Sequence, residues 1–191
     1  MFKERGFTLF EMLVVIGIVA VFSSIAVFNF SEARGQMALK RAAYQLIQDL
    51  RRAEEMAMSS IQSESCLLPA KGYGIYIYLG TGGSNKSYKL YADTTADGTV
   101  DCETAPVTLC YGYYNFPDCI VETINIQEKG VIISGVTALN QQVGINFKPP
   151  NPDVKIKWLQ GSELEITLAL ESNPSKTKKV IVSQTGVFQI R

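Results

Sequence analysis

Three regularly spaced aspartates could bind a cation. Asp93, Asp97 and Asp101 stand at positions 1, 5 and 9 of a twelve-residue count, with a threonine at position 3 and a glycine at position 6. Oxygen ligands follow this order in an EF-hand calcium loop. Position 12 holds Thr104 instead of glutamate, and we expect no flanking helices. We therefore favour an acidic turn built on Asp-Gly and keep calcium as a hypothesis for these three aspartates.

Residues suited to catalysis are scarce. The chain of 191 residues contains no histidine, so the commonest general base and the commonest zinc ligand are both absent. The glycine-rich stretch 80–87 lacks the glycine that precedes the lysine of a phosphate-binding loop. We find no convincing nucleophile–base pair either, and we expect neither an enzyme nor a bound cofactor.

Four cysteines, Cys66, Cys102, Cys110 and Cys119, lie in the C-terminal two thirds of the chain. None has Cys-x-x-Cys spacing, which argues against a zinc or thiol-redox motif. In a domain exported from the cytoplasm, an even number of cysteines indicates disulfides. We expect two disulfides, and three pairings are open.

One carboxylate stands inside an apolar run. Lys3 and Arg5 precede about twenty residues that end near Phe28, and Glu11 is the only ionisable side chain among them. That length suits a bilayer-spanning helix, and the two basic residues would keep the N-terminus cytoplasmic. An acidic side chain in such a segment is costly and normally has a partner and a role.

The stretch Gly6-Phe7-Thr8-Leu9-Phe10-Glu11, with its apolar run, resembles the class III signal of type IV pilins and type II secretion pseudopilins. The resemblance implies that prepilin peptidase cuts between Gly6 and Phe7 and methylates the new amine of Phe7. It also implies that Glu11 pairs with the amine of a neighbouring subunit during assembly. Other pilin subunits and an inner-membrane assembly platform are the partners that it suggests. Phe10 departs from the commonest pattern.

Two other interpretations of the N-terminus are an ordinary secretory signal peptide, cut near Ser24-Ile25-Ala26, and a plain signal anchor. Neither explains an acidic residue in the first turn of the apolar run. We therefore prefer the pilin-type interpretation.

The secondary structure C-terminal to Glu11 is predicted from the spacing of apolar residues. A helical period continues through residues 31–63, and its apolar positions are Leu39, Ala43, Leu46, Leu50, Ala53, Ala57 and Ile61. The simplest interpretation is one helix of about 55 residues and about 80 Å. We expect an α+β, pilin-like fold in which a long N-terminal helix, transmembrane in its first half, packs on an antiparallel β-sheet domain. The predicted parts are a leader (1–6), a transmembrane half (7–30), an amphipathic half (31–63) and a β-rich head (64–191).

From Gly72 onward the periodicity is that of strands joined by glycine, asparagine and proline turns. Residues 73–79 and 87–92 are predicted to form a hairpin. Further strands are predicted at 107–114, 120–127, 131–136, 143–147, 154–158, 164–170, 180–183 and 187–190.

The predicted head resembles the GspH/FimT-type minor pseudopilins more loosely, through Tyr73-Gly-Ile-Tyr-Ile, Tyr88-Lys-Leu-Tyr-Ala-Asp93 and the final strands with Gly186. This resemblance implies a minor structural subunit of a type II secretion pseudopilus or a type IV pilus. Such a subunit crosses the inner membrane once, with its head exported, and then enters a filament.

Basic residues near the C-terminus suggest an alternative function. Lys176, Lys178, Lys179 and Arg191 border the last predicted hairpin, and FimT-type pilins of DNA uptake suggest that such residues follow a DNA backbone. The formal net charge of the whole chain is zero. Glutamates at 163, 165 and 171 lie nearby, so we favour a solvated sheet edge over nucleic-acid binding.

Overall fold

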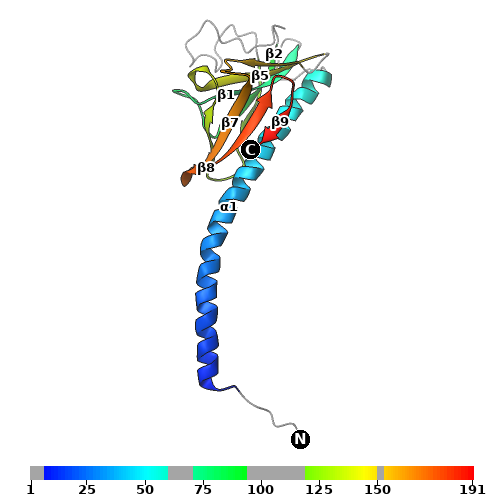
Figure 1. Ribbon diagram of the computed structural model, residues 1–191. Coiled ribbons are helices and arrows are strands. Elements are labelled where there is room, and N and C mark those ends of the chain that lie inside the picture. Colours follow the sequence, from blue (N-terminus) through cyan, green and yellow to red (C-terminus); the bar gives the residue numbers. More distant parts are fainter. Residues whose placement is uncertain (1–6, 60–70, 94–118, 150–152) are drawn as a thin grey trace. The chain divides into compact units, whose positions relative to one another are not determined.

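The computed structural model describes residues 7–59, 71–93, 119–149 and 153–191, without the side chains of residues 25–31, 119 and 153. The chain divides into two compact units, Met1–Met37 and Ala38–Arg191, each of which is described by itself. The long predicted helix is present as α1 (Leu9–Ser59), which begins in the first unit and ends in the second (Figure 1). Residues 60–63, expected to complete the helix, lie outside the description.

Two antiparallel sheets follow the helix, as the strand-like periodicity predicted. The first has the order β3-β2-β1-β5-β6 and contains β1 (Gly72–Tyr78), β2 (Ser87–Asp93), β3 (Cys119–Asn125), β5 (Gln142–Lys148) and β6 (Asp153–Lys157). The second has the order β4-β7-β8-β9 and contains β4 (Val131–Val136), β7 (Glu163–Leu170), β8 (Asn173–Ser183) and β9 (Phe188–Ile190). A short 3₁₀ helix, η2 (Leu139–Gln141), precedes β5.

Most predicted strands agree with these bounds, and β1 and β2 form the expected hairpin. The predicted strand 107–114 lies outside the described residues. One boundary was wrong: β8 begins at Asn173 rather than at Val180. Its first half is polar and carried no apolar alternation, but it pairs with β7, where Lys178 lies opposite Leu168 and Thr177 opposite Ala169.

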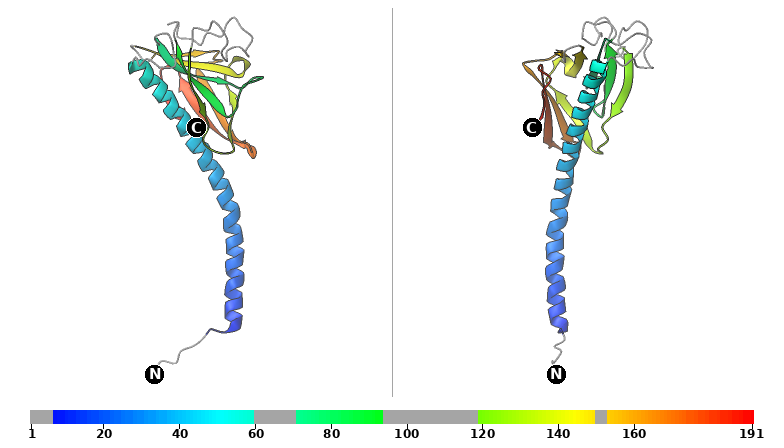
Figure 2. Two further views of the ribbon diagram at one scale, coloured as in Figure 1. Left: turned by 180° about the vertical axis from the view of Figure 1, so that it is seen from behind. Right: turned by 90° about the vertical axis from the view of Figure 1, so that its right-hand side faces the viewer.

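The second half of α1 packs against both sheets. Figure 2 shows this half, in cyan, with green strands of the first sheet on one side and orange-red strands of the second on the other. Leu46 and Leu50 are almost completely buried, and each such leucine contributes roughly 1.5–3 kcal/mol by leaving water. The predicted apolar stripe is confirmed for Leu39, Ala43, Leu46, Leu50, Ala53 and Ala57. Ile61 lies outside the description.

The core combines these helix residues with one face of each sheet. The first sheet contributes Ile75, Ile77, Leu90, Ile145 and Phe147, and the second contributes Leu164, Ile166, Val180 and Val182. On the opposite face of the first sheet, the ring of Tyr91 covers Gly74. A Cβ atom at Gly74 would lie 2.6 Å from that ring and even closer to the carbonyl oxygen of Ile145. Glycine is therefore required there for close packing.

Candidate processing and assembly site

The helix start is built as a reciprocal cap. The backbone N–H of Glu11 donates to Thr8 Oγ1 (3.2 Å), and Glu11 Oε2 accepts from the backbone N–H (2.9 Å) and the hydroxyl (3.0 Å) of Thr8. This is the capping box of Thr-x-x-Glu, which satisfies N–H groups that a helix start leaves without partners. A role was predicted for Glu11 but not for Thr8, although the Ser/Thr-x-x-Glu signature of a capping box identifies both residues.

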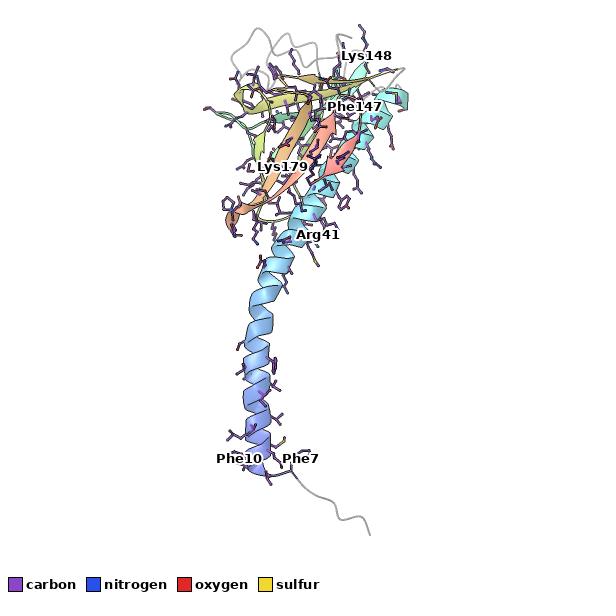
Figure 3. The ribbon with its side chains drawn as sticks, in the orientation of Figure 1. Phe7, Phe10, Arg41, Phe147, Lys148 and Lys179 are labelled. Atoms are coloured by element: carbon purple, nitrogen blue, oxygen red, sulfur yellow. The ribbon has the colours of Figure 1, made fainter. Side chains whose placement is uncertain are left out.

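The first turns of α1 expose large apolar side chains. Phe7 is 81% exposed and Phe10 is 72% exposed, and Figure 3 shows both at the helix start. The exposure continues along the helix to Phe22. A helix with apolar residues on every side normally requires an apolar environment or partner helices. Among the helical residues described with their side chains, no stretch is both long and apolar enough to cross a membrane.

A second site lies between α1 and β3, where a groove of about 440 Å³ separates the helix from the edge of the first sheet. Arg41 binds Glu128 through two contacts, Nε–Oε1 at 2.7 Å and Nη2–Oε2 at 3.0 Å, and Figure 3 labels Arg41 on the helix. Arg52 reaches Oε2 of Glu122 at 2.9 Å. The two ion pairs connect the helix to the strand and to the turn after it.

Gln45 lies between those pairs and binds the backbone at the strand end. Its Nε2 donates to the carbonyl of Asn125 (3.0 Å), and its Oε1 accepts from the N–H of Gln127 (3.1 Å). The side-chain amide of Gln45 thus makes the two hydrogen bonds, one donated and one accepted, that a peptide unit of a neighbouring strand would make. The α1–β3 groove is defined by the helix residues Arg41, Tyr44, Gln45, Gln48, Asp49 and Arg52 and by Glu122, Ile124, Gln127 and Glu128.

Asp49 lies in this groove, partly buried. Its Oδ2 accepts a 2.5 Å hydrogen bond from the Tyr88 hydroxyl. Burial raises the pKa of the Asp49 carboxyl above its ordinary value, while the Tyr88 hydrogen bond and the charge of Arg52 act in the opposite direction. Burial and the adjacent carboxylate also raise the pKa of Tyr88, so its hydroxyl remains the donor. The helical period predicted that Asp49 is solvated. Only its contact with Tyr88 of β2 shows that it is partly buried.

Replacing Asp49 by asparagine should leave the free energy of unfolding at neutral pH unchanged or higher. A carboxyl whose pKa is raised on folding contributes stability below its unfolded pKa, and that contribution is lost as pH rises through the folded pKa. At pH 7 the ionised side chain is therefore a cost, and asparagine can still accept from Tyr88. Urea unfolding of the full chain in detergent, followed by fluorescence of the single tryptophan Trp158, measures the effect. Clear destabilisation at pH 7 would contradict it.

The basic residues considered for DNA binding do not share one surface. Consecutive residues of a regular strand point to opposite faces, so Lys178 lies on the face of Val180 in β8 and Lys179 lies on the other. Lys176 lies where the pairing of β7 with β8 is irregular. Lys179 forms an ion pair with Glu165 (2.6 Å), and Figure 3 shows it in the second sheet. Arg191 is opposite Lys179, since the two exchange both backbone hydrogen bonds at 2.9 Å. Lys176, Lys178 and Lys179 thus lie within β8, and Arg191 directly follows β9.

The calcium and disulfide hypotheses fall largely outside the description. Asp97, Asp101 and three of the four cysteines lie there, and Cys119 begins β3 without a described side chain. Asp93 ends β2 and is completely buried, and its Oδ2 accepts from Asn146 Nδ2 at 2.8 Å. Within the described residues, no three acidic or cysteine side chains gather in a way that could hold a metal ion.

The comparisons with known proteins bear on the N-terminus. Residues 1–27 match the family model of the prokaryotic N-terminal methylation motif. This motif is the class III prepilin signal, and it indicates a pilin-like or pseudopilin-like protein that prepilin peptidase processes and that assembles with other pilins. It indicates a structural subunit, anchored in a membrane and later associated with a pilus. No curated protein and no solved structure matches the chain.

Proposed function

We propose that this chain is a minor pilin or pseudopilin, a structural subunit of a type IV pilus or a type II secretion pseudopilus. The observation that carries the proposal is the capped Thr8–Glu11 start of an apolar helix, inside the matched methylation motif. Cleavage would fall between Gly6 and Phe7, and Phe7 would carry the methylated amine.

Residues 7–30 would hold the subunit in the inner membrane, with the leader 1–6 cytoplasmic and the remainder exported. The exposed apolar side chains of this part of α1 support the proposal, because bilayer and filament core are both apolar surroundings. An assembly platform would then move the subunit into the filament, where N-terminal helices pack together. The second half of α1 would carry the β-rich head.

Glu11 would change partners during this transfer. In the single subunit its carboxylate caps its own helix through Thr8. In an apolar filament core, the charged amine of a neighbouring Phe7 is the stronger partner, because a charge pair gains strength where water is excluded. The GspH/FimT-type subclass is also part of the proposal, supported by a long helix seated on antiparallel sheets.

The intact mass of the protein from native membranes tests the proposal. We expect a chain that begins at Phe7 and carries one additional methyl group. Two disulfides would lower that mass by about four hydrogens, which a reductant restores. An uncut chain from cells with active prepilin peptidase would refute pilin-type processing.

DNA binding is the alternative function. The division of Lys178 and Lys179 between the two faces of the second sheet, and the ion pair of Lys179 with Glu165, do not favour it. Titration of the protein with DNA at several salt concentrations separates the two functions, since phosphate contacts give a steep salt dependence.

A further inference from the structure

The α1–β3 groove contains one carboxylate more than its own cations balance. Arg41 is held by Glu128 and Arg52 by Glu122. Asp49 is the third acidic residue of the groove, and within the described residues its only hydrogen-bond donor is the neutral Tyr88 hydroxyl. Within that part of the chain, Asp49 Oδ1 accepts no hydrogen bond.

Within the described residues, no further basic side chain forms an ion pair with Asp49. The stretches outside the description between residues 60 and 152 contain neither lysine nor arginine. Lys3 and Arg5 belong to the proposed leader, which cleavage removes. All other basic side chains lie in the described part, and none of them forms an ion pair with Asp49 there. Two cations and three carboxylates line the groove, and Arg52, the cation whose charge acts on Asp49, is already paired with Glu122.

In the part of the chain that the structure describes, the groove is open on one side. Within the described residues β3 is the last strand of its sheet, so no further strand covers the groove from outside. Tyr44, which is 50% exposed, and the exposed amide of Gln48 lie on its helix side. The ammonium of Lys40 already lies 6.0 Å from the centroid of the Tyr44 ring, so Asp49 and the Gln48 amide are the groups that would bind an incoming guanidinium or ammonium group.

We propose that the α1–β3 groove receives a lysine or arginine side chain of a neighbouring pilin subunit, with Asp49 as its counterion. The inference rests on the proposed function, because it assumes that this chain stands next to other subunits in a filament. The inference explains why the helix carries a half-buried carboxylate beside Arg52, a cation that is already paired with Glu122. The two ion pairs flanking Asp49 hold the groove walls and leave the central charge for the partner.

A photo-crosslinking residue at position 48, in the full chain expressed in its native cells, tests the contact. In sheared filaments we expect a crosslinked peptide from a second subunit that itself carries the N-terminal methylation motif, at or next to a lysine or arginine. A crosslink only to a protein without that motif, to lipid, or within the same chain overturns the inference. So does the absence of any crosslink in filaments that contain the protein.

Charge substitution provides the second measurement. Asp49→Asn should reduce recovery of the chain in filaments by at least about tenfold while its processed mass stays normal. The matched control is Glu55→Gln, which removes the same charge from an exposed position of the same helix and should have little effect. Asp49→Lys should abolish incorporation, and exchange of the crosslinked basic residue for aspartate should restore it.

The two proposals fail in different ways. Absence of the wild-type chain from filaments would refute the filament function itself. Normal incorporation of both Asp49→Asn and Asp49→Lys, with wild-type chain present in filaments, would refute only the role of the groove.

Discussion

Glu11→Gln is expected to leave cleavage after Gly6 intact and to lower the amount of this chain in filaments by at least about tenfold. Glutamine has the shape of glutamate and can still accept from the Thr8 N–H and hydroxyl, which Glu11 now binds at 2.9 and 3.0 Å. It cannot neutralise the amine of a neighbouring Phe7 in an apolar core. The measurement compares the protein in sheared filaments with that in membranes, and the intact mass reports processing.

Thr8→Ser is the matched control for this experiment. Serine retains the hydroxyl that accepts from Glu11 N–H, so the cap persists and incorporation should remain near the wild-type level. If Glu11→Gln assembled as well as the control, the carboxylate would serve only as a helix cap.

Leu50→Ala is expected to lower the free energy of unfolding by about 2–5 kcal/mol. Leu50 is fully buried in the core shared by α1 and both sheets, and truncation removes apolar contacts and leaves a cavity. Urea unfolding of the full chain in detergent, followed by the fluorescence of Trp158, gives the value. The ring centroid of Trp158 lies 6.2 Å from that of Tyr76 in β1, so the emission of Trp158 reports on the first sheet.

Gln48→Ala is the control on the same helix. Its side chain is exposed in the α1–β3 groove and is not part of the core, and exposed substitutions of this kind change stability by less than about 0.5 kcal/mol. A loss below about 1 kcal/mol for Leu50→Ala would mean that this part of α1 is not seated on the sheets.

Much of the fold was predictable because its signals are local. The apolar positions of α1 recur every three or four residues, and the burial of Leu39, Leu46 and Ala53 agrees with that period. Successive residues of the strand segments show the two-residue period of a β-strand. The turn between β1 and β2 contains glycines that favour a hairpin. The polar half of β8 was missed, since its pairing with β7 is the reason that it is a strand.

The sequence by itself determined the match to the methylation motif, because this motif depends on residue types and their spacing along one short segment. It also determined the helix period and the strand-rich nature of the head. Only the tertiary structure decided the order of the strands, since pairs such as β1 with β5 join segments far apart in the chain. It also placed Asp49 against Tyr88 and divided Lys178 from Lys179. Burial and charge pairing depend on which segments meet, and that depends on the register of the whole sheet.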